Sequence, residues 1–111
     1  MKLILAAAIL VACSFLVRAG EPIPIASVTG PVGIVVATNN NHVYVLDSVQ
    51  FQFSTYGSVR IFDGVTNAFI RSFSTGQFSH AITLDGYHNK VYVAGGDDAV
   101  WIINSNTDQL D

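Results

Sequence analysis

From about residue 24 onward the chain alternates short apolar runs with clusters of small polar residues, and it has no helical periodicity there. The runs are rich in Val, Ile, Tyr and Phe, and each ends at Gly, Asn, Asp or Ser. This pattern is typical of a turn-rich antiparallel β protein. We therefore expect an all-β fold with short strands at residues 25–29, 33–38, 42–47, 58–63, 68–72, 80–85, 90–94 and 100–104.

Part of this pattern occurs twice. Val43-Tyr44-Val45 recurs as Val91-Tyr92-Val93, each time after a polar turn. Downstream, residues 59–67 align with residues 100–108, at a smaller offset along the chain. The difference between the two offsets corresponds to an insertion around residues 48–56 of the first copy. The chain therefore contains two copies of one supersecondary unit.

The two copies resemble the YVTN family of β-propeller repeats, over about residues 24–110. In that family a Gly-containing turn, a Val-Tyr-Val strand and a strand ending in Asp before Thr-Asn follow one another. The matching segments are Thr29-Gly30, Val43-Tyr44-Val45 and Asp63 in the first copy and Thr75-Gly76, Val91-Tyr92-Val93 and Asn104 in the second. Asn104 departs from the family's Asp. The resemblance implies β-propeller blades of four antiparallel strands, one at about residues 30–73 and an incomplete one at about residues 76–111.

About two blades do not make a closed propeller, because closed propellers contain ~4 to 8 blades. Both faces of the Val43–Leu46 and Val91–Ala94 strands are apolar, which indicates that each blade packs against a neighbour on both sides. We expect this sequence to be a fragment of a longer protein. The alternative is that the chain assembles with itself or with a partner to cover its faces.

The N-terminal segment at positions 1–19 has the layout of a secretory signal peptide, with Lys2, an apolar run at residues 3–17 and then Arg18-Ala19-Gly20. The apolar run is shorter than the ~20 residues of a membrane span, so we expect no membrane span; a buried helix is the alternative. Cleavage before Gly20 predicts an exported protein, periplasmic or extracellular, with residues 20–111 as the partial propeller. Cys13 ends a segment that resembles a bacterial lipobox, so lipidation at Cys13 and a lipid anchor form the alternative route.

Charge narrows the classes of partner. The chain that follows the predicted signal peptide carries three basic and eight acidic side chains, a net charge near −5. An acidic surface of this kind disfavours nucleic acid and anionic membranes as partners.

Candidate chemistry is sparse. His80 is the one weak candidate for ligand binding: in related propellers this position, at the start of an inner strand, points to the central channel, whereas the alternative is a bond to its own turn. His42 and His88 are interpreted as solvated turn residues, and Asp97-Asp98 as part of a hairpin turn. No nucleophile, phosphate-binding or paired-histidine motif occurs, so no catalytic residue, metal ligand or cofactor is assigned.

The aromatic residues are interpreted as packing residues, with an aromatic ligand platform as the alternative; they are Tyr44, Phe62, Tyr92 and Trp101. In the turn at residues 63–67, Asp63 is expected to bond to backbone groups, and Gly64 to adopt a positive φ.

With the predicted signal peptide, the resemblance implies an exported, non-catalytic binding or interaction protein whose top face or channel binds a protein, a glycan or a small molecule. The alternative is part of a propeller enzyme, lactonase-like or a metal-dependent hydrolase, in which His80 and a carboxylate from another blade line the central channel.

Overall fold

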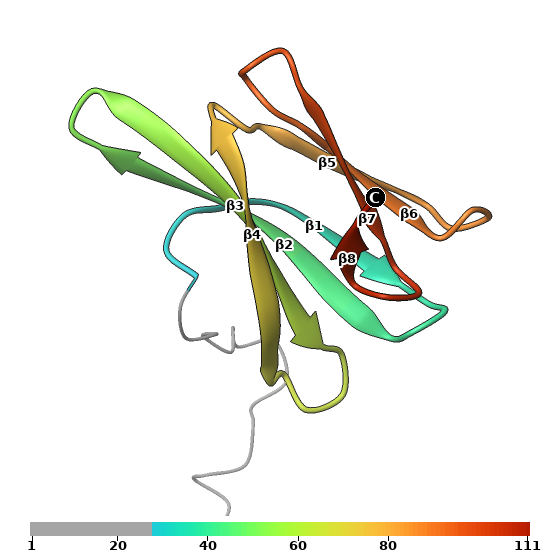
Figure 1. Ribbon diagram of the computed structural model, residues 1–111. Coiled ribbons are helices and arrows are strands. Elements are labelled where there is room, and N and C mark those ends of the chain that lie inside the picture. Colours follow the sequence, from blue (N-terminus) through green and yellow to red (C-terminus); the bar gives the residue numbers. More distant parts are fainter. Residues whose placement is uncertain (1–27) are drawn as a thin grey trace, which may run out of the picture.

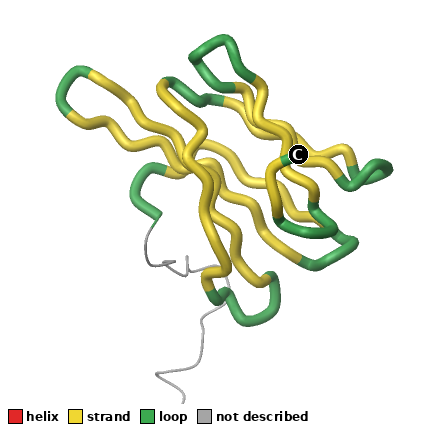
Figure 2. The backbone as a smooth tube through the Cα atoms, in the orientation of Figure 1, coloured by secondary structure: helices red, strands yellow, loops and turns green. Residues whose placement is uncertain are grey.

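The computed structural model of the protein describes residues 28–111, and in this range the chain forms eight strands and no helix (Figures 1 and 2). The strands are β1 (Pro31–Ala37), β2 (His42–Phe51), β3 (Ser54–Asp63), β4 (Phe69–Gln77), β5 (Ala81–Asp85), β6 (Lys90–Ala94), β7 (Val100–Asn104) and β8 (Gln109–Leu110). The all-β prediction is confirmed.

The strands form two four-stranded sheets in which chain order and spatial order are the same. The first sheet has the order β1-β2-β3-β4 and the second the order β5-β6-β7-β8, and every neighbouring pair is antiparallel. The two sheets lie one against the other, with β1 next to β5, and they do not close into a ring (Figure 1). Antiparallel neighbours of this kind need only short hairpin connections.

Two sequence-based expectations change. Of the strand predicted at residues 25–29, residues 25–27 lie outside the described residues, and Val28 and Thr29 are not in a strand. The insertion at residues 48–56 extends a hairpin: β2 and β3 continue in register as far as the pair Phe51 and Ser54. The added residues therefore lengthen two existing strands, because each gains a hydrogen-bonded partner across the ladder.

The first sheet is closed on one side by the second. The core between the sheets consists of Ala37, Tyr44, Leu46, Val59, Ile61, Val91, Val93 and Ile103, all nearly inaccessible to solvent. At Gly33 the sheets approach so closely that a Cβ atom would lie 2.6 Å from Cγ2 of Ile82. The absence of a side chain at this position is what lets β1 and β5 touch.

The backbone repeats along with the sequence. Asn41 and Asn89, which precede β2 and β6, have φ angles of 57° and 55°. Asn67 and Asp108, which precede β4 and β8, have φ angles of 61° and 55°. Each pair occupies equivalent positions of the two copies, so the sequence repeat is also a structural repeat.

The two sheets nevertheless contact each other through opposite faces of this repeat. The first sheet contributes Tyr44 and Leu46 of β2 to the core, whereas the second contributes Val91 and Val93 of β6. Tyr44 and Leu46 are equivalent to Tyr92 and Ala94, which lie on the other face of the second sheet. The sheets therefore pack head to tail, as successive units of a stack do.

The turn between β3 and β4 is as expected in one respect and different in another. Asp63 Oδ1 accepts hydrogen bonds from the backbone N–H groups of Val65 (2.8 Å) and Thr66 (2.9 Å), and the same bonds lower the pKa of Asp63. The expectation of a positive φ at Gly64 is wrong, because Asn67 has the positive φ. Asn adopts this conformation more readily than most other residues with a side chain.

Candidate functional site

His80 lies in the connection between β4 and β5, with its side chain exposed to solvent. Its Nδ1 is 2.9 Å from the carbonyl oxygen of Phe78, and its backbone N–H donates to the carbonyl of Ala94 (3.3 Å). Phe78 has a φ of 57° and donates its own N–H to the carbonyl of Thr55 (2.9 Å). The ring of His80 is thus held by its own turn, which is the alternative that the sequence left open. The enzymatic role, which needs a carboxylate from another blade, stays a prediction.

The other two histidines differ from each other. His88 is exposed in the turn between β5 and β6, as predicted, and its Nδ1 lies 2.7 Å from Asp85 Oδ2; bonds from His88 lower the pKa of Asp85. The interpretation of His42 as a solvated turn residue is wrong. His42 is the first residue of β2, and its half-buried ring lies with Nδ1 2.7 Å from Asp108 Oδ2.

The loop with Asp97 and Asp98 joins β6 to β7 and closes over the end of β4. Asp97 Oδ2 accepts from the backbone N–H of Gln77 (3.1 Å), and the N–H of Gly96 donates to the carbonyl of Gln77 (2.9 Å). Because β4 is the last strand of its sheet, no further strand pairs with Gln77 on that side, and the carboxylate of Asp97 accepts its N–H bond instead. This loop holds the two sheets together at one end.

Asp108 forms a polar contact between the sheets at the other end. Its side chain accepts hydrogen bonds from the Tyr44 hydroxyl (2.5 Å) and the Asn40 amide (3.3 Å), and its carbonyl accepts from Arg71 (3.1 Å). Asp108 is 8% exposed. Burial, and then the bond to Asp108, raise the pKa of Tyr44 above its ordinary value of 10.0. The buried carboxylate and the protonated hydroxyl therefore stabilise each other.

Sequence reasoning missed this contact. The sequence assigns Tyr44 to packing, which is correct for its ring, and it marks Asp108 only as the end of a turn. The two residues are 64 positions apart, and no local pattern pairs them. The one available signal is the equivalence of Asp108 with Asn67, which marks a polar side chain at the same place in both copies.

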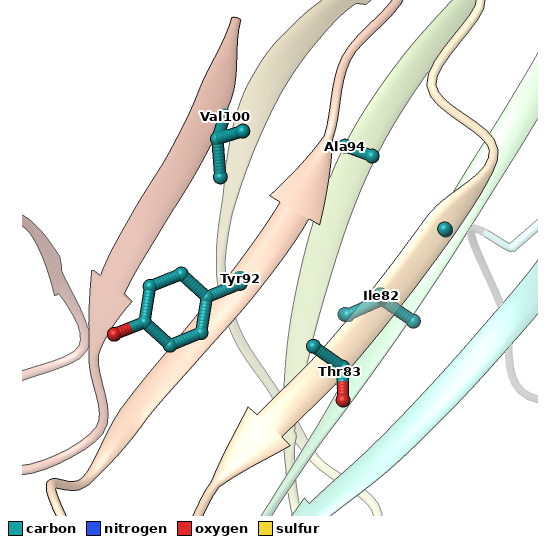
Figure 3. A pocket seen from close by; sticks show the side chains of 6 residues that line it. Ile82, Thr83, Tyr92, Ala94 and Val100 are labelled. Carbon is teal, nitrogen blue, oxygen red and sulfur yellow. The ribbon is translucent and has the colours of Figure 1, made fainter.

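The outer face of the second sheet, turned away from the first sheet, carries a shallow apolar hollow (Figure 3). Its volume is about 140 Å³, and its lining consists of Ala81, Ile82, Thr83, Tyr92, Ala94 and Val100. The register places Ala94 opposite Ala81 and Val100, so strands β5, β6 and β7 all contribute. Ligand pockets that enclose a small molecule have volumes of roughly 300 to 1,000 Å³. The hollow therefore suits single side chains of a partner.

The outer face of the first sheet is also apolar at its edge strand β1. Ile34 and Val36 point the same way along β1 and are 63% and 49% exposed, and Val32, at the β-bulge between Pro31 and Gly33, is 54% exposed. Behind them on the same face, Val45 and Phe62 are buried. Exposed branched side chains on an edge strand are costly to leave in water.

Residues 28–111 contain no group of three or more His, Cys, Asp or Glu side chains placed to hold a metal ion. Within the same range there is no helix of the length and apolar character needed to cross a membrane. Cys13, the predicted lipidation site, and the predicted signal peptide lie outside the described residues.

Comparisons of the chain with protein-family models, with curated proteins and with solved structures find no match.

Proposed function

We propose that this chain belongs to an exported, non-catalytic interaction protein, that it contributes two β-propeller-type blades, and that it binds a protein partner through the outer face of the second sheet. The observation that carries the proposal is the hollow on that face. Its lining contains no charged side chain, and Val100 at its edge is 63% exposed. Burial of such a surface against a partner is favourable by roughly 25 cal/mol per Å².

The repeat supports the same use of this face. The residues of the first sheet that are equivalent to Val100 and Tyr92 are Val59 and Tyr44. The neighbouring sheet buries Val59 and Tyr44 completely. A surface with the same residue types and the same strand geometry is therefore suited to contact another protein surface. A protein is favoured over a glycan or a small molecule, because the hollow is shallow and its side chains offer few polar atoms.

Export is proposed from the sequence of the N-terminal segment, with cleavage before Gly20, and lipidation at Cys13 is the alternative. The blade assignment is supported by the two four-stranded units of the chain, which repeat in sequence and in backbone conformation.

Site-specific photocrosslinking tests the binding face. A photoreactive p-benzoylphenylalanine is placed at position 100 of the full-length chain, and the matched control carries it at position 53, where Phe53 is fully exposed at a hairpin tip away from the hollow. Irradiation of producing cells is expected to give a discrete adduct of higher mass at position 100 and none at position 53. If position 100 gives no protein adduct, or if both positions give the same adducts, the proposed function is wrong.

A further inference from the structure

We infer that the partner of the second sheet's outer face is a second copy of this chain, which docks head to tail through the outer face of its first sheet. The inference rests on the proposed function and names the occupant of the same face. It follows from the contact that the two sheets already make within one chain.

The contact between the two sheets within one chain is the template for the first docking surface, the outer face of the second sheet. Within one chain, the first sheet offers Tyr44, Leu46, Val59 and Ile61 to the second sheet. The second sheet has Tyr92, Ala94, Val100 and Ile102 at the equivalent positions, and these lie on its outer face. The register confirms that they share one face, because Tyr92 pairs with Ile102 and Ala94 pairs with Val100. The second sheet thus presents the surface that the first sheet presents in the buried contact.

The second surface has its counterpart along β1 alone, because Val45 and Phe62, which are equivalent to Val93 and Ile103, are already buried within the chain. Within one chain, the second sheet uses Ile82 and Leu84 of β5 against the first sheet. Their equivalents in β1 are Ile34 and Val36, which are 63% and 49% exposed on the outer face of the first sheet. A second copy can therefore place Ile34 and Val36 where Ile82 and Leu84 lie in the existing contact.

Two substitutions between the copies shape this contact. Gly33 lets Ile82 approach closely, and its equivalent Ala81 carries one methyl group, so β1 of the second copy sits slightly farther out. Arg60 takes the place of Trp101, and its Nε donates to the buried carboxylate of Asp47 (3.1 Å). Because Asp47 neutralises its charge, Arg60 can lie at the margin of an apolar contact with its methylene groups towards the partner.

The polar contact also has an equivalent. Within one chain the Tyr44 hydroxyl donates to Asp108, a residue with positive φ at the end of a turn. The corresponding residues are Tyr92 on the hollow and Asn67, which has the same backbone conformation. The turn of the second copy can thus bring the Asn67 amide oxygen to the Tyr92 hydroxyl. An uncharged acceptor makes this bond weaker than the one to Asp108.

Head-to-tail contacts of this kind form either a closed ring or an open fibre, depending on the rotation between neighbours. Closed propellers of ~4 to 8 blades would need about two to four copies of a two-blade chain. Assemblies larger than one chain are therefore expected when the faces are free.

Sedimentation velocity on the purified protein tests the inference with two blocking variants. Ile34→Asp places a charge on the outer face of the first sheet, and Val100→Asp does so on the outer face of the second. Phe53→Asp, at a fully exposed hairpin tip, is the matched control. Each blocking variant is expected to weaken self-association at least about tenfold, because an unpaired charge would be buried in the contact. The control is expected to associate as the unaltered chain does.

An equimolar mixture of the two blocking variants is the decisive sample. Each retains one intact face, so the mixture is expected to form a heterodimer and nothing larger, at concentrations where each variant alone stays monomeric. All three positions are exposed in the single chain, and far-UV circular dichroism checks the fold; Val36→Asp replaces Ile34→Asp if the latter misfolds.

Three results would overturn the inference: an unaltered chain that is monomeric up to about 100 μM, a blocking variant that self-associates as strongly as the unaltered chain, or a mixture that stays monomeric. The second and third results also separate head-to-tail docking from a symmetric contact between identical faces. If the photocrosslink at position 100 joins the chain to a different protein, the proposed function stands and the second copy is excluded. If it joins two copies of this chain, both are supported.

Discussion

The inner face of the first sheet and the outer face of the second carry equivalent residues in opposite environments. Val59 is completely buried, whereas Val100 at the equivalent position is 63% exposed. Tyr44 is completely buried and bonded to Asp108, whereas Tyr92 borders an open hollow. The residue types match, so the neighbouring sheet causes the difference. An apolar strand pattern therefore shows that a face suits burial and leaves open what buries it.

The largest expected effect is on the free energy of unfolding, and it distinguishes the buried inner face of the first sheet from the exposed outer face of the second. Leu46→Ala gives the first sheet the residue that the second has at Ala94, and it removes a completely buried side chain. We expect the free energy of unfolding to fall by about 2 to 5 kcal/mol, because a cavity remains between the sheets. Val100→Ala, on the exposed counterpart, is expected to change it by less than about 0.5 kcal/mol. Urea unfolding at low protein concentration measures both, and equal losses would contradict the comparison.

A smaller effect on the free energy of unfolding distinguishes the hydroxyl group of Tyr44 from that of the equivalent Tyr92. Tyr44→Phe removes the donor to the buried carboxylate of Asp108, and we expect a loss of about 1.5 to 3 kcal/mol, typical of a hydrogen bond to a charged group. The Tyr92 hydroxyl has no hydrogen-bond partner among residues 28–111, so Tyr92→Phe is expected to be near neutral in the monomer. The same urea titration applies. A neutral Tyr44→Phe would mean that the polar contact does not stabilise the pair of sheets.

The smallest effect concerns alkaline pH. The pKa of Tyr44 in the folded chain is raised above its ordinary value of 10.0, so the unfolded chain loses this proton first as the pH rises. The stabilisation is complete below about pH 10 and declines above it, by about 1.4 kcal/mol for each pH unit. We expect the Tyr44→Phe variant to lose less stability between pH 10 and pH 11 than the unaltered chain loses. Urea midpoints at the two pH values measure this, and equal declines in the variant and the unaltered chain would refute it.

The strand positions were largely predictable because they depend on neighbours in sequence. Val91-Tyr92-Val93 lies in β6 and residues 100–104 form β7, as the alternation of β-branched residues and turn residues indicated. The hairpin extension at residues 48–56 was missed although the sequence signals it: Val49, Phe51 and Phe53 alternate with polar residues, which is the period of two of a strand.

The candidate site was less predictable. His80 stands out in the sequence as a weak candidate, and its ring is bonded to its own turn. The hollow of the second sheet is made of residues such as Ala94 and Val100 that carry no reactive group and therefore no motif. His42 and Asp108 lie far apart in the chain and come together only because the two sheets stack.

The sequence by itself determined the all-β class, the two repeated units and the positions that alternate between the two faces of each sheet. These properties follow from backbone propensity, turn residues and the period of two along a strand. Only the tertiary structure decided which face of each unit is buried, since that depends on which sheet lies beside it. The stacking of the sheets buries Val59 and leaves Val100 exposed. It also places the carboxylate of Asp108, in a turn of the second sheet, against the hydroxyl of Tyr44 in the first.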